Sequence, residues 1–204
     1  MNYYKINLIL GIMLVLIAFF MYLGSHIDVP LSTFFLLPES KHLVFITKEI
    51  SNTGSVVFTM GVGLFLTIIL WVKKRTVDAI WFFLTLASSR IFFSLAKLLF
   101  LRHRPVFDHP FVHALNYSFP SGHSANALVL VLASFIVFNR MNMLVKLCFL
   151  GWVLLVSWSR LALGAHWTSD IIAGWGGGLL WMALAYRMRE IMFLTYLRKK
   201  YALK

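Results

Sequence analysis

Three ionisable side chains occur together in the segment SRLALGAHWTSD, residues 159–170, which lies between two apolar stretches. Arg160 precedes His166 by six residues, and Asp170 follows His166 by four. Residues four apart share a face where a helix begins, so the Asp170 carboxylate could hold Nδ1–H of His166 and leave Nε2 free. An imidazole held in this way is a good nucleophile or general base. For this pair alone, the alternative is an aspartate that merely favours the helix dipole.

A second histidine lies in the segment FPSGHS, where we expect Pro120 to open a helix. The small residues Ser121 and Gly122 would leave the first amides of that helix uncovered, and such amides favour an anion such as phosphate. His123 would then lie beside the anion and could protonate a leaving oxygen. Its alternative is a polar residue at the membrane interface.

Cations at the ends of apolar stretches supply the third part of the predicted site. Lys97 and Arg104 lie in the segment KLLFLRHRP, and Arg160 lies near the end of a later stretch. Each cation alone could reach lipid headgroups. However, only Asp108 and Asp170 are acidic residues near these positions in the sequence, so the cations together indicate an anion supplied from outside. Arginine suits phosphate because its planar fork donates two parallel hydrogen bonds.

Other polar residues near these segments have weaker contexts. Arg90 lies seven residues before Lys97, on roughly the same helix face. We favour a structural role, in which Arg90 hydrogen-bonds to helix carbonyls and serines, over a place in the lining of the same cavity. His103, His109 and His113 are expected to be outer-loop residues.

The acidic residues are too few for a metal-dependent phosphatase. The chain has seven Asp and Glu residues, no H-E-x-x-H segment and one cysteine. No close carboxylate pair falls in the segments that carry the predicted site. We therefore predict an enzyme with neither metal nor cofactor, in which cations stabilise the phosphate.

The elements that must position these residues are predicted to be membrane helices. The chain is 60% hydrophobic and 13% charged, with a mean hydropathy of +0.82, which is typical of a bilayer protein. We predict an all-α, polytopic membrane protein with a single domain over residues 1–204. Six apolar runs, each long enough to cross the bilayer, cover residues 7–24, 54–72, 76–101, 121–138, 143–163 and 170–187.

Three finer expectations concern these runs. The first run is expected to be an uncleaved helix rather than a signal peptide, because no A-x-A-like site follows it. Cys148 is expected to be a small buried hydrophobe. The run GWGGG at residues 174–178 is expected to allow close helix packing rather than to bind phosphate.

The net charge of +12 is concentrated before the first run and after the second, fourth and sixth runs. This distribution predicts cytoplasmic termini and contact with anionic lipids, and it argues against nucleic acid as a partner. The connections 25–53, 102–120 and 164–169 would then face outward. In the first connection we expect Pro30 and Pro38 to separate short interfacial helices. These helices would bury apolar side chains in the interface: Phe34, Phe35, Leu36, Leu43, Val44 and Phe45.

Three motifs together resemble the signatures of the type 2 phosphatidic acid phosphatase (PAP2) superfamily. They are K-x6-R-P at 97–105, P-S-G-H at 120–123 and S-R-x5-H-x3-D at 159–170, and their order and spacing agree with the family pattern. The resemblance implies that His166 forms a phosphohistidine, that Asp170 orients it and that His123 protonates the leaving group. It implies a phosphate site made of Lys97, Arg104, Arg160, Ser121 and Gly122.

The predicted function is a membrane lipid phosphatase acting at the outer membrane face. Within the superfamily, size and topology resemble bacterial members that act on phosphatidylglycerophosphate or undecaprenyl pyrophosphate, and phosphatidate is a third candidate substrate. A lipid-to-lipid phosphotransferase could use the same site. A lipid transporter would also need intramembrane charges, but here the charges gather at one face and no inverted repeat is evident.

Overall fold

The computed structural model describes residues 3–106, 111 and 116–202. These residues form eight α-helices and no strand, which confirms the expected all-α fold. In chain order the helices are α1 (Tyr3–Leu23), α2 (Ser25–Phe34), α3 (Lys41–Thr53), α4 (Val56–Val72), α5 (Thr76–Phe100), α6 (Gly122–Val137), α7 (Met143–Ala162) and α8 (Thr168–Ala202).

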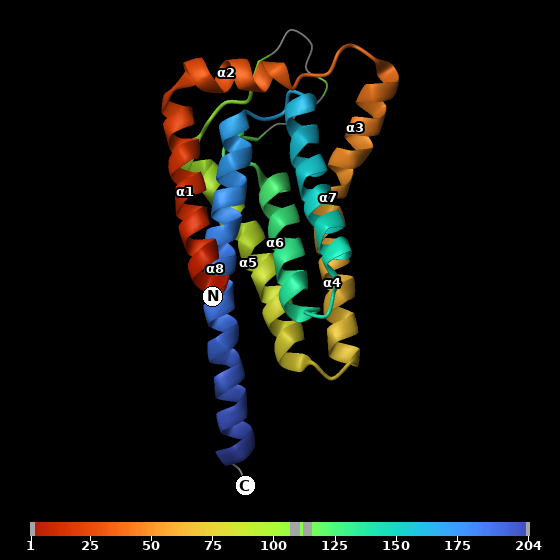
Figure 1. Ribbon diagram of the computed structural model, residues 1–204, viewed down its shortest axis with the longest axis vertical. Helices are drawn as coiled ribbons and strands as arrows, with labels where there is room; N and C mark the ends of the chain where they lie inside the picture. Colours follow the sequence, from red (N-terminus) through yellow and green to blue (C-terminus); the bar gives the residue numbers. More distant parts are fainter. Residues whose placement is uncertain (1–2, 107–110, 112–115, 203–204) are drawn as a thin grey trace.

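Six helices (α1, α4, α5, α6, α7 and α8) run roughly side by side, and they match the six apolar runs of the sequence (Figure 1). Helix α2 lies across one end, and α3 slopes down beside α7 into α4. By length and composition α1, α5 and α7 can each cross a membrane, and the pair α3–α4, bent by 42°, is a fourth candidate. Helix α6 is apolar but shorter, so the six-span topology stays a prediction.

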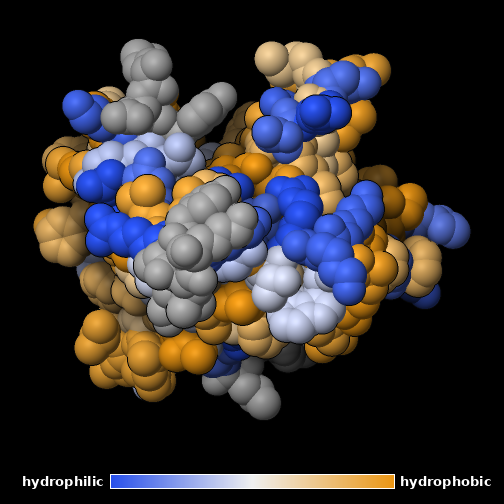
Figure 2. Space-filling model, turned by 90° about the horizontal axis from the view of Figure 1, so that it is seen from below, coloured by the Kyte–Doolittle hydropathy of each residue, from blue (hydrophilic) through white to orange (hydrophobic). Residues whose placement is uncertain are grey.

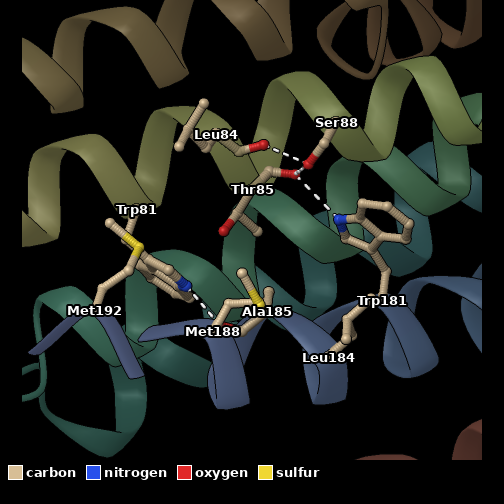
Figure 3. A pocket seen from close by; sticks show the side chains of 9 residues that line it. All are labelled: Trp81, Leu84, Thr85, Ser88, Trp181, Leu184, Ala185, Met188 and Met192. Carbon is tan, nitrogen blue, oxygen red and sulfur yellow. Dashed lines mark hydrogen bonds between the residues drawn. The ribbon is translucent and has the colours of Figure 1, made fainter. Parts of the chain in front are cut away.

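Helix α6 lies at the centre of the bundle, with α4, α5, α7 and α8 packed around it. Its side chains are buried along most of its length, and Val129 and Val137 join a core cluster with residues of α5 and α8. Beside this cluster α5 and α8 enclose a largely apolar cavity of about 150 Å³ (Figure 3). There Trp81 Nε1 donates to the Ala185 carbonyl at 2.6 Å, and Trp181 Nε1 donates to the Thr85 carbonyl at 3.2 Å.

The glycine run of α8 permits close contact with two neighbouring segments. A Cβ at Gly176 would lie 2.9 Å from the Val15 backbone nitrogen of α1, and one at Gly174 would lie 2.7 Å from the Ser121 carbonyl oxygen. A side chain at either position would force the backbones apart, so the expected role in helix packing is confirmed. The second contact also fixes α8 against the start of α6.

Three expectations about local structure need correction. Pro30 lies inside α2, which continues through it although a proline lacks the N–H for one helix hydrogen bond. Pro38 does lie between α2 and α3. Helix α3 descends beside α7 instead of lying flat across the end, although Phe34 and Phe45 are exposed as expected of lipid-facing side chains. Cys148 is exposed on the outside of α7 rather than buried, a position that suits a small apolar thiol if that surface faces lipid.

The two ends of the bundle differ, and we name them by their connections. The motif end carries residues 101–106, 116–121 and 163–167, and the turn end carries the α4–α5 and α6–α7 connections. Seen from the turn end, hydrophilic side chains gather over the end face while hydrophobic ones form much of its rim (Figure 2). At this end Asp78 accepts from Arg75 at 2.6 Å and from Arg189 at 2.8 Å.

Candidate functional site

The first turn of α6 is open at the motif end. Helix α6 begins at Gly122 with Ser121 as its N-cap, so Pro120 precedes the cap rather than opening the helix as expected. The Ser121 side chain makes no cap hydrogen bond, and its amide donates to the Asp170 carbonyl at 2.9 Å. In the described chain the amides of Gly122, His123 and Ser124 have no acceptor. Such amides at the positive end of a helix dipole can bind an anion.

His166 and Asp170 form the contact that the sequence spacing predicts. His166 Nδ1 lies 3.0 Å from Asp170 Oδ2, and the two side chains are 2% and 0% exposed. The same carboxylate oxygen accepts the Trp167 amide at 3.0 Å, as in a capping box, because α8 begins at Thr168. Asp170 therefore both caps the start of α8 and orients the imidazole.

The other ring nitrogen of His166 faces Arg104. Arg104 Nη1 lies 3.3 Å from His166 Nε2 and donates to the Ala165 carbonyl at 2.5 Å. Burial, with the positive charges of Arg104, Arg160 and Lys97, holds the pKa of His166 well below its ordinary value. Burial also lowers the pKa of Arg104, and the Asp170 carboxylate opposes that shift. A neutral His166 with Nδ1–H on Asp170 directs its Nε2 lone pair toward Arg104 Nη1.

Each predicted phosphate-binding cation is held by the protein. Lys97 Nζ donates to the carbonyls of Tyr117 and Ser118 at 2.7 and 3.0 Å. Arg104 Nε donates to the Asn116 carbonyl at 2.8 Å. Helix α3 reaches the site through Ser51, which accepts from Arg160 Nη1 at 2.5 Å. Arg160 Nε is buried and has no partner among the described residues, so the site retains an unused donor.

His123 completes the cluster from the first turn of α6. It is half-buried and lies within electrostatic reach of His166, Arg104, Arg160 and Lys97. The eight residues predicted for the site thus lie together at the motif end. Beside Arg160 a cavity of about 380 Å³ lies between α3 and α7, with Ser51 and Asn52 in its lining.

Sequence reasoning missed an ion-pair network that supports Asp170. Arg102 donates to Asp170 Oδ1 and to Asp28 Oδ2, at 2.7 Å each. Asp28 also accepts the amide of Ser169 at 2.9 Å and its hydroxyl. The expected scarcity of internal counter-ions is therefore wrong for Arg102. Asp28, an acid in the largely apolar first connection, was the signal in the sequence that could have indicated this network. Its partner Arg102 lies 74 residues away, so the sequence does not pair them.

The side chain of His103 does not join the cluster. His103 is exposed, with its ring centroid 6.4 Å from that of Tyr117. Asp108, His109 and His113 lie outside the described residues. In the part of the chain that the structure describes, no group of three His, Cys, Asp or Glu side chains is placed to hold a metal ion.

A model of the PAP2 superfamily matches residues 78–192, more than half of the chain, so the protein belongs to this superfamily of phosphatases. It is 32% identical over 128 residues to phosphatidylglycerophosphatase B of Bacillus subtilis (strain 168). That match covers 59% of this chain and 60% of the relative.

Two solved structures share the fold. A crystal structure of a transmembrane PAP2-type phosphatidylglycerolphosphate phosphatase from Bacillus subtilis superposes with a TM-score of 0.78 at 24% identity, over 90% of this chain and 96% of that one. The Aquifex aeolicus protein LpxE gives a TM-score of 0.65 at 18% identity, over 79% of this chain and 95% of its own. The protein therefore has the helical fold of membrane-spanning PAP2 proteins.

Proposed function

We propose that the protein is a lipid phosphatase that hydrolyses a phosphate monoester or diphosphate through a phosphohistidine on His166. The observation that carries this proposal is the 3.0 Å contact between His166 Nδ1 and Asp170 Oδ2, which leaves Nε2 toward Arg104 beside the open turn of α6. Similarity to a phosphatidylglycerophosphatase makes phosphatidylglycerophosphate the first candidate substrate. Phosphatidate and undecaprenyl pyrophosphate carry the same terminal group.

In the first step, Nε2 of His166 attacks phosphorus while the bond from phosphorus to the leaving oxygen breaks. A protonated His123 gives its proton to that oxygen, and the dephosphorylated lipid leaves. The side chains of Lys97, Arg104 and Arg160 bind the other phosphate oxygens, with Ser121 and the Gly122 amide beside them. The Asp170 carboxylate stabilises the positive charge that develops on the imidazole.

In the second step, water attacks the phosphohistidine. His123, now neutral, accepts a proton from that water while the bond between nitrogen and phosphorus breaks. Inorganic phosphate leaves, and both histidines return to their starting forms. No step needs a metal, because cations and helix amides neutralise the phosphate.

We also propose that all six long helices span the membrane, with both termini in the cytoplasm and the motif end outside. Lys73, Lys74, Arg75 and Arg140 lie at the turn end, and positive residues are typical of the cytoplasmic side. A substrate phosphate at the motif end would then lie at the outer leaflet.

The activity is tested with purified protein, one lipid at a time and no acceptor lipid. We expect release of inorganic phosphate, and an acid-labile, alkali-stable phosphoenzyme in rapidly quenched reactions. Excess EDTA should not change the rate. Product that appears only with an acceptor lipid would show phosphotransfer, and activity restored by magnesium after chelation would contradict the metal-free mechanism.

The orientation is tested with single cysteines in a Cys148→Ser background. Val106, 93% exposed at the motif end, and Arg140, exposed at the turn end, are each replaced by cysteine. A membrane-impermeant maleimide added to intact cells should label Val106→Cys and should label Arg140→Cys only after permeabilisation. The reverse pattern would overturn the proposed orientation.

A further inference from the structure

The side chain of Arg90 in α5 has no partner among the residues that the structure describes. Its carbonyl accepts from Ser94 Oγ at 3.0 Å, but no hydrogen bond or ion pair involves its guanidinium. The structural role expected from the sequence, with bonds to helix carbonyls and serines, is therefore absent. A cation in a membrane helix is costly unless it is paired, so this guanidinium calls for an anion from outside the chain.

The guanidinium points toward the candidate site rather than away from it. Arg90 Nη1 lies 4.0 Å from the position that a Cβ on Gly122 would occupy. Arg90 also acts electrostatically on Lys97, seven residues further along α5. The charge of Arg90 therefore lies near Gly122 at the start of α6.

Arg90 differs from Lys97, Arg104 and Arg160 in the position of its backbone and in the hydrogen bonding of its guanidinium. Lys97, Arg104 and Arg160 each donate to protein acceptors, whereas the Arg90 guanidinium has no acceptor among the described residues. Seven residues of α-helix correspond to about 10 Å along the axis. The backbone of Arg90 thus lies about two turns below Lys97, toward the middle of the bundle, and its guanidinium reaches from there to the start of α6.

Because the Arg90 side chain approaches the site from the middle of the bundle, its position indicates which part of a lipid it meets. The inference rests on the proposed function, in which the terminal phosphate reacts at the motif end and the tails lie in the hydrocarbon. Any group between the reacting phosphorus and the tails must pass on the membrane side of His123. Phosphatidate has only a neutral glycerol ester there, whereas a lipid with two phosphates places a second anion there.

We propose that Arg90 binds a second phosphate in the leaving part of the substrate, and so favours lipids with two phosphates over lipids with one. The second phosphate is the phosphodiester of phosphatidylglycerophosphate or the inner phosphate of a polyprenyl diphosphate. Arginine suits either group because two N–H donors of its fork match two phosphate oxygens. Binding there also holds the leaving oxygen near His123.

The test compares substrates that share a tail and differ in whether a second phosphate is present. One pair is farnesyl phosphate and farnesyl diphosphate, and the other is dioctanoyl phosphatidate and dioctanoyl phosphatidylglycerophosphate. The measured quantity is the ratio of kcat/KM for the two-phosphate lipid to kcat/KM for the one-phosphate lipid. A charge-assisted hydrogen bond corresponds to roughly 10-fold to 100-fold in such a ratio.

We expect Arg90→Gln to lower the ratio by about that factor in at least one pair, and the pair affected identifies the second anion. Arg90→Lys, which keeps the charge but not the fork, should lower it less and carries the comparison if the glutamine variant does not fold. Arg140→Gln, at an exposed position of the turn end, is the matched control and should leave both ratios unchanged.

Two outcomes would overturn the proposal. In one, Arg90→Gln lowers the rate on all four lipids equally, which would place Arg90 at the reacting phosphate or in a structural role. In the other, both ratios stay at their wild-type values. Failure of the proposed function itself looks different, because the wild-type protein would then release phosphate from none of the four lipids.

Discussion

The motif end of the bundle is joined by hydrogen bonds between charged groups, whereas α5, α6 and α8 are joined lower down by apolar packing. At the motif end, Arg102 alone links Asp28 of α2 to Asp170 of α8. In the lower part, Phe82, Val129 and Met182 are fully buried in one cluster. The polar contacts there include two tryptophan N–H bonds to carbonyls and, at the turn end, the ion pair between Asp78 and Arg189.

The two regions contribute differently to stability and to function. Buried ion pairs recover little more than the cost of removing charges from water, so they are weak evidence of net stabilisation. Close packing supplies most of the association between membrane helices. The charged network at the motif end is therefore best explained by the phosphate chemistry that it supports. Substitutions at the motif end should therefore mainly change turnover, and substitutions in the apolar core should mainly change the free energy of unfolding.

The largest effect on turnover is expected from His166→Ala. Removal of the proposed nucleophile should lower kcat by about 10⁴-fold or more, because the other groups cannot form the covalent intermediate. Phosphate release from the preferred lipid and the yield of quenched phosphoenzyme both measure this loss. His42→Ala, at an exposed position on α3, should keep wild-type turnover. Near-normal kcat in the His166 variant would remove the nucleophile assignment.

Arg102→Gln should change stability as well as turnover. Its loss strands the carboxylates of Asp28 and Asp170, whose side chains are 1% and 0% exposed. Breaking a buried ion pair on one side costs about 3–5 kcal/mol, which denaturant unfolding in detergent would measure. Turnover should also fall, since Asp170 would lose an interaction that keeps it ionised and in place.

A double variant sharpens this prediction. Adding Asp28→Asn to Arg102→Gln removes one of the stranded charges, so the double variant should recover part of the lost unfolding free energy. Strictly additive effects of the two substitutions would mean that the 2.7 Å contact between Arg102 and Asp28 contributes no coupling.

The residues of the site could be predicted because their spacing carries local information. The four-residue interval between His166 and Asp170 predicts a shared face at a helix start, and the structure has that contact. Apolar runs of membrane length likewise predicted the long helices to within a few residues at most ends. The overrun of α8 to Ala202 was not predicted, because its last part is strongly charged.

The partners of the site could not be predicted, because they come from segments whose positions depend on the whole fold. Asp28 and Ser51 lie among other polar residues of the first connection, with no spacing that relates them to Arg102 or Arg160. Their contacts span 74 and 109 residues. Only the packing of α2 over the bundle end and of α3 against α7 brings them to the site.

Ser51→Ala tests one of these unpredicted partners, with a smaller effect. The hydroxyl accepts from Arg160 Nη1 at 2.5 Å in a buried setting, and its loss frees the guanidinium to move. We expect kcat/KM to fall by about 10-fold, the scale of one hydrogen bond to a charged group, mostly through a higher KM. Ser51→Thr keeps the hydroxyl and should restore most of the loss. Equal rates for the alanine variant and the wild-type protein would show that Arg160 needs no support from α3.

Trp81→Phe tests the apolar core between α5 and α8 and should have the smallest effect. Trp81 is 2% exposed and donates Nε1–H to the Ala185 carbonyl at 2.6 Å, across the contact between α5 and α8. Phenylalanine keeps most of the apolar contact but loses this hydrogen bond, so the free energy of unfolding should fall by about 1–2 kcal/mol. Since Trp81 lies four turns of α5 below Lys97, kcat/KM per folded molecule should stay within about twofold of wild type. A large loss of kcat/KM at unchanged stability would mean that packing between α5 and α8 positions the motif end, and the separation of the two regions would then fail.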